Sequence, residues 1–356
     1  MSAARRKAGD FAARLIRWHA AQGRHDLPWQ TDWRTLGDPY RVWLAEIMLQ
    51  QTQVATVIPY YARFLERFPT LATLAAASPD EVMAQWSGLG YYARARNLHR
   101  CAQVLVNEYG GTFPRGPEAL AALPGIGRST ANSIATCCFG ARVPILDGNV
   151  KRVFCRAFGI EGFPGAAPVE RRLWQLAIEL MPARGGETYN QAQMDLGATV
   201  CTRGRPACAR CPLDDICVAR AGGRTAELPA PRPRKAVPER ALTLLVLRDA
   251  AGRVWLETRP PAGIWGGLKC LPELPPGLAP AEHARRALGC ELDAVSPGLT
   301  FNHVLSHFRL RITPVLCAAR PLPACAEAAG EWMPLESALA AGLPAPVRRI
   351  LGEIGP

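Results

Sequence analysis

The sequence has 356 residues, of which 49% are hydrophobic, and its formal net charge at pH 7 is +12. This length exceeds one comfortable hydrophobic core, so we expect two domains, and the positive charge predicts attraction to polyanions such as nucleic acid. No apolar run reaches the roughly 18 residues of a membrane span, and the first ten residues lack the apolar region of a signal peptide. We therefore expect a cytoplasmic protein with no membrane partner.

The first predicted elements are helices. Residues 11–22 form an amphipathic pattern, and Asp38-Pro39 predicts the start of a second helix, because Asp favours the N-cap and Pro the first helical position. We expect this second helix to carry the sequence from Tyr40 to Val54. Within it, Glu46 has apolar neighbours, and a carboxylate is costly there unless it is paired or protonated. A solvated glutamate on the polar helix face is the alternative interpretation.

A third helix is predicted by apolar residues three and four positions apart, which would form a buried face. These residues are Val54, Val57, Ile58, Tyr61, Phe64, Leu65 and Phe68. Ser78 and Glu81 form a capping box around Pro79, and the run Gly88 to Arg96 follows. Its two glycines permit a turn, and its aromatic and basic side chains could contact DNA by stacking and charge. Packing is the alternative role for such an aromatic pair.

Residues 123–153 organise the predicted fold. The run Leu123-Pro124-Gly125-Ile126-Gly127 leaves the backbone free to turn and to point its N–H groups outward at the start of the next helix, as a phosphate grip requires. A plain interhelical turn is the alternative. Asp147 follows twenty residues past this hairpin and begins the run Asp147-Gly148-Asn149. A helix N-cap is the alternative role for this aspartate.

Two more helices are expected over 171–180 and 190–197, and a cysteine cluster follows them. The cluster has the spacing C-x6-C-x2-C-x5-C and consists of Cys201, Cys208, Cys211 and Cys217. Four thiolates within seventeen residues suit either tetrahedral zinc or a 4Fe–4S cluster, and the spacing alone does not choose between them. The other eight cysteines show no ligand spacing, and we expect most of them to be buried: Cys101, Cys137, Cys138, Cys155, Cys270, Cys290, Cys317 and Cys325.

The composition changes after a Pro-rich and basic stretch over 228–238, which predicts an extended linker. Residues 241–248 and 253–259 are strand-like and flank a turn, so they predict a hairpin. A helix over 281–288, strands near 299–316 and terminal helices are expected to complete an α+β half.

Several of these runs resemble the MutY-type adenine DNA glycosylases of the endonuclease III superfamily. They are E-I-M-L-Q-Q-T-Q-V from Glu46, G-L-G-Y-Y-A-R-A-R from Gly88, the hairpin with D-G-N-V-K-R-V from Asp147, and the cysteine spacing. This resemblance covers about the first 225 residues. In the second half, G-I-W-G-G-L from Gly263 and H-V-L-S-H-F from His303 resemble the nudix-like C-terminal domain of the same family.

The resemblance implies a mainly α N-terminal catalytic region, a helix-hairpin-helix glycosylase with a 4Fe–4S domain, followed by an α+β nudix-like C-terminal domain. The implied glycosylase region is 1–226, with a six-helix barrel over about 30–134 and an iron–sulfur subdomain from about 1–29 and 135–226. A linker over 227–238 and an 8-oxoguanine recognition domain over 239–356 complete the chain.

The resemblance also implies a base-excision repair enzyme that removes adenine mispaired with 8-oxoguanine or guanine in double-stranded DNA. A monomer that associates with a bacterial nucleoid is expected. Breaking an N-glycosidic bond calls for an acid at the leaving base and an anion at the sugar, with the two pKa values pushed apart by environment. Glu46 is the expected proton donor, and Asp147 is expected to stay ionised and to stabilise the sugar cation, with a transient covalent bond as one possibility.

The resemblance also implies the remaining site residues. The implied substrate and DNA contacts are Gln51, Tyr91, Leu123, Gly125, Gly127, Ser129, Asn149, Gln191, Leu305, Ser306 and His307, and the four clustered cysteines are the implied cluster ligands. Gln51 and Tyr91 would fill or wedge the gap in the duplex, and Gln191 would read the extruded adenine. Leu305-Ser306-His307 aligns with the family's Phe-Ser-His loop that inspects the opposite base, and Leu305 departs from it by giving up aromatic stacking.

Ser129 distinguishes between two activities. In relatives that also cut the strand, a lysine at this position forms a Schiff base, which a hydroxyl cannot form, so we expect a monofunctional glycosylase. The alternatives are a bifunctional glycosylase and lyase of the endonuclease III type, and a non-catalytic iron–sulfur DNA-binding protein. The helix at 281–288 lacks the acidic cluster of a nudix hydrolase, so phosphoanhydride hydrolysis is not expected.

Overall fold

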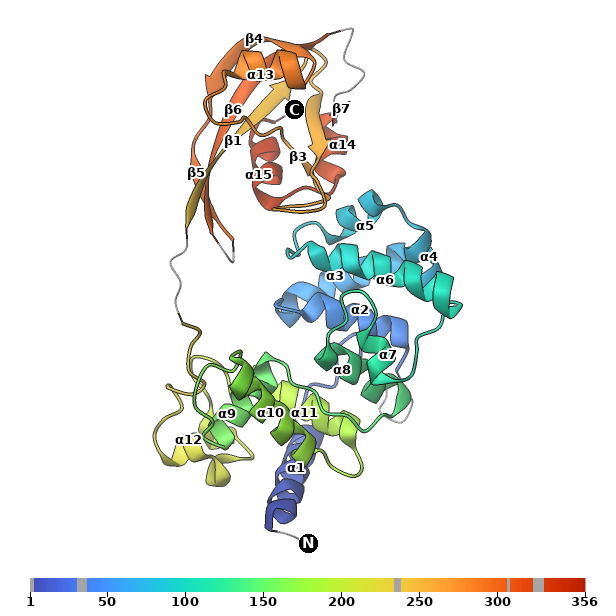
Figure 1. Cartoon of the computed structure of the whole chain (residues 1–356), viewed down its shortest axis with the longest axis vertical. Coiled ribbons are helices and arrows are strands. Elements are labelled where there is room, and N and C mark those ends of the chain that lie inside the picture. Colours follow the sequence, from blue (N-terminus) through green and yellow to red (C-terminus); the bar gives the residue numbers. More distant parts are fainter. Residues whose placement is uncertain (1–2, 31–36, 234–237, 306–307, 323–329, 356) are drawn as a thin grey trace. The chain divides into compact units, whose positions relative to one another are not determined.

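A computed structural model describes the chain except for residues 1–2, 31–36, 234–237, 306–307, 323–329 and 356 (Figure 1). The chain forms two compact units. Unit 1 consists of Met1–Tyr61 and Arg100–Arg234, and unit 2 of Ala62–His99 and Lys235–Pro356. These units are not the domains expected from the family pattern, whose boundaries stay a prediction. In the described residues, no helix has both the length and the apolarity to cross a membrane.

Unit 1 is helical. Two of its helices, α3 and α6, also have residues in unit 2. Its elements are α1 (Ala3–Gln22), α2 (Pro39–Leu49), α3 (Val54–Arg67), α6 (Ala93–Tyr109), α7 (Pro117–Ala121), α8 (Arg128–Phe139), α9 (Gly148–Ala157), α10 (Ala167–Leu180), α11 (Gly186–Thr199), the short 3-10 helices η1 (Cys208–Arg210) and η2 (Asp214–Ile216), and α12 (Val218–Ala221).

Helix α2 begins as predicted and ends earlier than predicted. The Asp38 side chain accepts a hydrogen bond from the Tyr40 backbone N–H at 2.9 Å, and Pro39 occupies the first turn. The expected continuation to Val54 is wrong, because α2 ends at Leu49. Gln51 has a φ of 58°, in the left-handed region that no α-helix can contain, so the chain turns there before α3 begins.

The buried face of α3 is narrower than predicted. Val57, Tyr61, Phe64 and Phe68 are buried, as their spacing of three and four requires. The expectation for Ile58 is wrong, because its side chain is 36% exposed. One residue advances a helix by about 100°, which turns Ile58 away from the face that Val57 begins.

The core of unit 1 lies where α1, α9 and α11 pack together. The ring of Phe11 meets those of Phe154 and Tyr189 edge-on, with centroids 6.0 and 6.5 Å apart. Leu15 and Leu196 are fully buried in the same cluster. Because this core joins the first helix to α9 and α11, which lie far along the chain, it fixes these two helices, and both carry pocket residues.

The described residues of unit 2 form a seven-stranded sheet. The sheet order is β3-β2-β1-β6-β4, with β5 paired to β6 and β7 paired to β2, and β1 runs parallel to β6 while the other pairs are antiparallel. The elements of this unit, besides parts of α3 and α6, are α4 (Leu71–Ala76), α5 (Pro79–Trp86), β1 (Glu239–Arg248), β2 (Val254–Thr258), β3 (Lys269–Cys270), α13 (Pro280–Ala287), β4 (Cys290–Pro297), β5 (Phe301–Val304), β6 (Arg309–Pro321), β7 (Gly330–Met333), α14 (Leu335–Ala340) and α15 (Ala345–Glu353).

Most of the predicted elements of unit 2 are confirmed. The capping box of Ser78 and Glu81 starts α5, β1 and β2 form the expected hairpin, and α13 is the expected helix. Strand β4 was not predicted, because most of its residues are exposed and it lacks alternating apolar residues. Within this unit Arg348 of α15 donates to Ser87 Oγ at 3.0 Å, and Ser87 Oγ donates to the Leu343 carbonyl at 2.9 Å, so α5 and the C-terminal helices hold each other.

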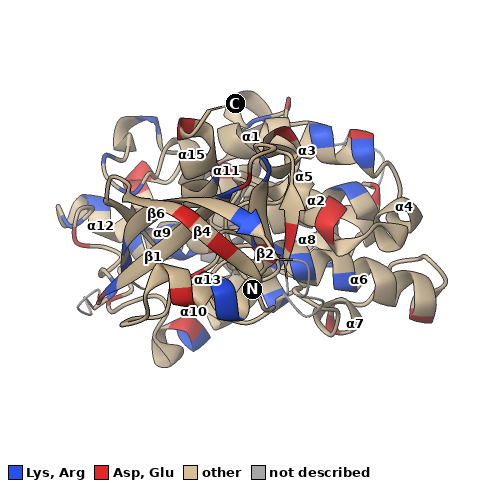
Figure 2. Ribbon diagram, turned by 90° about the horizontal axis from the view of Figure 1, so that it is seen from above, with Lys and Arg blue, Asp and Glu red and all other residues tan. Residues whose placement is uncertain are grey.

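The excess of basic residues is spread over the chain. Figure 2 shows Lys and Arg on helices and strands of both units, interspersed with Asp and Glu. The net charge of +12 therefore belongs to the whole chain rather than to one basic segment.

Candidate active site

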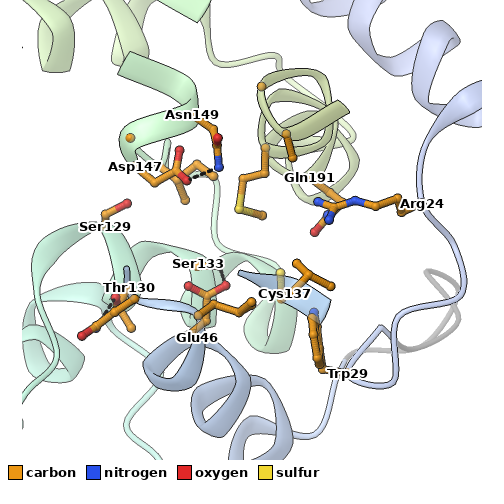
Figure 3. A pocket seen from close by; sticks show the side chains of 18 of the residues that line it. Arg24, Trp29, Glu46, Ser129, Thr130, Ser133, Cys137, Asp147, Asn149 and Gln191 are labelled. Carbon is orange, nitrogen blue, oxygen red and sulfur yellow. Dashed lines mark hydrogen bonds between the residues drawn. The ribbon is translucent and has the colours of Figure 1, made fainter. Parts of the chain in front are cut away.

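A pocket of about 1190 Å³ lies in unit 1 and brings together six of the residues singled out in the sequence. They are Glu46, Gln51, Ser129, Asp147, Asn149 and Gln191. Figure 3 shows Glu46 and Asp147 on opposite sides of this pocket, with Ser129 near Asp147 and with Gln191 beside Arg24. Helices α2, α8, α9 and α11 contribute lining residues, so a packed scaffold positions the two carboxyl groups.

Glu46 is a carboxyl group held in its place by one hydroxyl. Ser133 of α8 donates a hydrogen bond from Oγ to Glu46 Oε1 at 2.9 Å. Burial raises the pKa of Glu46 to about 7, the Ser133 bond opposes that rise, and the nearby charge of Asp147 adds to it. A carboxyl with a pKa near neutrality can be protonated before a reaction and can act as a base after it.

Asp147 is the N-cap of α9 and lines the pocket. Its Oδ1 accepts from the Val150 N–H at 2.8 Å and caps α9, while its Oδ2 accepts from Asn149 Nδ2 at 3.0 Å. Burial raises the pKa of Asp147, whereas the bonds from Val150 and Asn149 and the charge of Arg152 oppose this rise. The expectation of an ionised Asp147 thus depends on these donors and on the N-terminus of α9, whose dipole favours an anion.

The segment before Asp147 is held by buried polar side chains. Asn132 Nδ2 donates to the Pro144 carbonyl at 2.6 Å, and Thr136 Oγ1 and Asn190 Nδ2 donate to the Val143 carbonyl at 3.1 and 3.0 Å. This segment belongs to no helix or strand, so its carbonyls need such partners when buried. The polar residues of α8 therefore fix the path that the chain follows toward Asp147.

Ser129 lies at the junction of the hairpin and that segment. Its Oγ accepts a hydrogen bond from the Leu146 N–H at 3.0 Å, one residue before Asp147. The hydroxyl thus links α8 to the loop that carries the aspartate. A lysine ammonium has only donors and could not accept this bond.

Close packing sets the position of the first turn of α9. A Cβ added at Gly197 of α11 would lie 2.5 Å from Asn149 Cβ and 3.0 Å from its Cα, so only glycine permits this approach of α11 to α9. Arg152 then joins the same helices by donating to the Gly197 carbonyl at 2.6 Å and to Asn149 Oδ1 at 2.8 Å. Gly197 and Arg152 thus fix Asn149, whose amide donates to Asp147.

Two of the predicted DNA-contacting residues have unusual backbones. Among the described non-glycine residues, positive φ occurs at Gln51 (58°), Tyr91 (51°) and Trp265 (56°). Such conformations cost about 1 to 3 kcal/mol each and tend to occur at functional sites. Gln51 lines the pocket of unit 1, whereas Tyr91 lies in unit 2 with 45% of its surface exposed.

The turn that presents Tyr91 is supported by a buried cation. The Arg94 guanidinium lies 5.4 Å from the centroid of the Tyr91 ring and 5.3 Å from that of Trp86. The same group donates to the carbonyls of Leu89 and Gly90 at 3.3 and 3.1 Å. Arg94 therefore holds the backbone of the turn and one face of the exposed ring at once.

The remaining predicted DNA contacts lie elsewhere. Leu123, Gly125 and Gly127 form the turn between α7 and α8, with Leu123 buried and Gly125 at a φ of 78°, and Gly127 is the N-cap of α8 without a side-chain cap. Leu305 is in unit 2, where its N–H donates to the Phe308 carbonyl at 3.0 Å. Ser306 and His307 lie outside the described residues.

Sequence reasoning missed several pocket residues. Arg24, Trp29, Ser133 and Cys137 all line the pocket. Ser133 and Cys137 lie four and eight positions after Ser129 on α8, so helical periodicity was the available signal for these two. No local pattern marked Arg24 and Trp29, which come from the loop between α1 and α2. Burial raises the pKa of the Cys137 thiol to about 12, so it is neutral in the pocket.

One further carboxylate supports the wall of the pocket. Asp195 of α11 is fully buried and accepts hydrogen bonds from Arg24 and from Gln191. Burial raises the pKa of Asp195, but the bonds from His19 and Arg24 outweigh it, so the pKa lies below its ordinary value. This carboxylate is therefore ionised at neutral pH.

The clustered cysteines surround a separate small cavity. Cys201, Cys208, Cys211 and Cys217 all line it, together with the buried Arg156, whose Nη1 lies 3.3 Å from Cys201 Sγ. Positive charge beside a sulfur favours the thiolate that metals bind. Among the described residues, no three His, Cys, Asp or Glu are grouped tightly enough to hold a single metal ion.

The other cysteines behave largely as predicted. Cys101, Cys138, Cys155, Cys270, Cys290 and Cys317 are buried. Cys137 is half-buried at the pocket, and Cys325 lies outside the described residues.

Comparison with known proteins identifies the class of this fold. The family model described as "HhH-GPD superfamily base excision DNA repair protein" matches residues 44–178, and the one described as "NUDIX domain" matches residues 243–353. A solved structure of a thermostable thymine-DNA glycosylase is similar with a TM-score of 0.54 and 27% identity, covering 62% of this chain and 100% of that one. The class is a helix-hairpin-helix protein of base excision repair with an added nudix domain.

The relatives specify the family further. The adenine DNA glycosylase of Buchnera aphidicola subsp. Acyrthosiphon pisum (strain APS) is 35% identical over 352 residues, which are 96% of each chain. The adenine DNA glycosylase of Homo sapiens is 48% identical over 216 residues, which are 59% of this chain and 39% of the human protein. The chain belongs to the adenine DNA glycosylase family. The family and fold class predicted from the sequence are confirmed.

Glu46 should lower the stability of the fold at high pH. Its pKa is about 7 in the folded chain and ordinary in the unfolded chain, so only the unfolded state is ionised between those two values, and stability falls as pH rises through that window. Glu46→Gln removes this effect. Chemical denaturation should give the free energy of unfolding of both proteins at each pH. The advantage of the variant over the wild type should grow by about 2 to 3 kcal/mol as the pH rises from about 5 to about 8.

Glu118→Gln is the control, because Glu118 is an exposed glutamate on α7 and its loss changes the net charge equally. An equal gain in both variants, or none at Glu46, would contradict the assigned burial effect.

Proposed function

We propose that this chain removes adenine paired with 8-oxoguanine or guanine in double-stranded DNA by hydrolysing its N-glycosidic bond. The observation that carries the proposal is the placement of Glu46 and Asp147 on opposite sides of one pocket, beside a helix-hairpin-helix. A base must leave the duplex to enter such a pocket, which costs a few kcal/mol and is easiest at a mispair.

Glu46 acts at the base. With a pKa of about 7, a large fraction of this carboxyl carries a proton at neutral pH and can transfer it to a ring nitrogen of the leaving adenine. The Ser133 hydroxyl holds Oε1 while this transfer takes place. After adenine has left, the ionised Glu46 can accept a proton from the attacking water.

Asp147 acts at the sugar. Loss of adenine leaves positive charge on the sugar, and an anion close to it lowers the barrier. The donors Val150 N–H and Asn149 Nδ2 favour the ionised form of Asp147 and orient its oxygens. Asp147 stabilises this cation by charge, and a short-lived covalent bond to the sugar is compatible with the same placement.

Strand cleavage is not part of the proposed activity. Ser129 cannot form a Schiff base, and its Oγ is occupied by the Leu146 N–H. Lys151, on the first turns of α9, is paired with Glu170 at 2.6 Å. These features favour a monofunctional glycosylase over the endonuclease III type of enzyme.

DNA is held by groups of both units in this proposal. In unit 1, the N–H groups at the Gly125-Ile126-Gly127 turn bind a phosphate, and the strained Gln51 fills the gap left by an extruded base. In unit 2, the strained Tyr91 wedges into the duplex. In unit 2, Leu305, Ser306 and His307 inspect the opposite base, with Leu305 pressing on it without aromatic stacking.

The cysteine cavity fits a 4Fe–4S cluster. Four thiols line it, and four cysteine thiolates are the ligand set that holds such a cluster. Cys201, Cys208, Cys211 and Cys217 would hold the cluster, which would supply structural support near α9 and α12. Arg156 would balance its negative charge.

Single-turnover base release from an A:8-oxoguanine duplex tests the proposed reaction. The wild type should release adenine and should leave the strand intact until alkali is added. Glu46→Gln keeps an oxygen acceptor for Ser133 but has no transferable proton, and Asp147→Asn keeps a good helix cap but has no charge. We expect both variants to bind the duplex and to lose at least about a hundredfold in rate.

Cleavage of the strand without alkali would favour the lyase alternative. Binding by the wild type without any base release would favour a non-catalytic DNA-binding protein. Near wild-type rates in either variant would remove that residue from the mechanism.

Metal analysis tests the cluster. Anaerobically purified protein should contain about four iron atoms per chain and absorb in the blue region of the visible spectrum. Cys208→Ser should lower the iron content, whereas Cys138→Ser, a buried cysteine of α8, should not. Stoichiometric zinc without iron would refute the assignment.

A further inference from the structure

We propose that Asp195 is a positioning residue that fixes the amide of Gln191, so that the pocket accepts adenine and rejects purines with a 6-oxo group. The inference rests on the proposed function, because it concerns the base that enters the same pocket. Its observation is the fully buried Asp195 carboxylate, which binds two pocket-lining side chains, Arg24 and Gln191.

Among the described residues, Arg24 and Gln191 donate hydrogen bonds to the Asp195 carboxylate. Its Oδ1 accepts from Arg24 Nε at 2.9 Å, from Arg24 Nη2 at 2.6 Å and from Gln191 Nε2 at 2.8 Å. Its Oδ2 accepts from the Arg24 backbone N–H at 2.8 Å and lies 3.3 Å from His19 Nε2. A buried anion with this many partners is rigid, because losing any one of them would leave it unsatisfied.

This arrangement determines which end of the Gln191 amide faces the base. A carboxylate has no hydrogen to donate, so only the NH₂ end of the amide can face Asp195. The carbonyl oxygen, Oε1, then points away from Asp195, and one N–H of Nε2 is left as well. Gln191 thus offers the pocket one acceptor beside one donor.

That pattern complements adenine. The outer edge of adenine presents the N6 amino donor beside the N7 acceptor, and a glutamine amide binds both at once. In guanine and hypoxanthine the same edge has O6 in place of the amino group, so two acceptors would face each other at that position. A fixed Gln191 therefore separates amino purines from oxo purines.

Arg24 contributes to the same selection by being held back. Two of its three guanidinium nitrogens, Nε and Nη2, each donate one N–H to Asp195 Oδ1, so these two N–H groups are not available to a base. Gly23 packs closely beside His19, since a Cβ at Gly23 would lie 2.3 Å from the His19 ring. The His19 and His25 rings also pack edge-on with centroids 4.7 Å apart. A released guanidinium would present donors that suit a 6-oxo group.

The test compares base release from three duplexes that carry adenine, hypoxanthine or unsubstituted purine opposite 8-oxoguanine. Asp195→Asn keeps the size of the side chain but can donate as well as accept, so it permits the Gln191 amide to turn over. We expect the ratio of the adenine rate to the hypoxanthine rate to fall by roughly tenfold to a hundredfold. The purine rate, which requires no N6 contact, should fall much less than the adenine rate.

Thr199→Val is the matched control on α11. It removes the bond from Thr199 Oγ1 to the Asp195 main-chain carbonyl at 2.8 Å and leaves the carboxylate untouched. The adenine-to-hypoxanthine ratio should stay at its wild-type value. Equal loss on all three duplexes in Asp195→Asn, or an unchanged ratio, would overturn the inference and leave a merely structural role.

Gln191→Met provides a second route if Asp195→Asn does not fold. Methionine keeps the length of the side chain without the amide, so the adenine-to-hypoxanthine ratio should fall as it does in Asp195→Asn. The double variant Asp195→Asn with Gln191→Met should show no lower ratio than Gln191→Met alone. A wild-type ratio in Gln191→Met would overturn the inference. A wild type that releases no adenine would instead refute the proposed function, which separates the two failures.

Discussion

Two carboxyl groups share one pocket, and burial raises the pKa of both. Glu46 accepts a hydrogen bond from the Ser133 hydroxyl, and its pKa reaches about 7. Asp147 has the N–H of Val150, the Asn149 amide and the charge of Arg152, all of which oppose the rise. More groups therefore oppose the rise at Asp147 than at Glu46, which suits the proposed roles of Asp147 as the anion and Glu46 as the proton carrier.

This difference depends on how unit 1 is packed. Ser133 belongs to the hairpin helix α8, and the donors to Asp147 belong to the first turn of α9, which Gly197 of α11 approaches closely. The segment between α8 and α9 is held to α8 by Asn132 at Pro144 and by Ser129 at Leu146, the residue before Asp147. The same helices that form the pocket thus set its electrostatics, and a shift of α11 would disturb Asn149 and Asp147 together.

Local signals predicted the elements and part of the site. The Asp38 cap, the Ser78 capping box and the hairpin were readable because each is set by neighbouring residues. The left-handed backbone of Gln51 could not be predicted, since no local rule places a glutamine in that conformation. Helix α2 therefore ends earlier than predicted. The contacts Ser133–Glu46 and Arg24–Asp195 join residues 87 and 171 positions apart, so only tertiary packing reveals them. Family resemblance supplied the roles of Glu46 and Asp147, which no spacing could have given.

The central claim is that protonated Glu46 donates to the leaving base, and the pH dependence of single-turnover adenine release tests it most directly. We predict a rate that is level below about pH 7 and falls tenfold per pH unit above it, as Glu46 ionises. The Ser133 bond lowers the pKa of Glu46, so the variant Ser133→Ala, which lacks this bond, should show the fall in rate at higher pH. A rate that stays level well above neutrality, or a fall at the same pH in both proteins, would contradict the account.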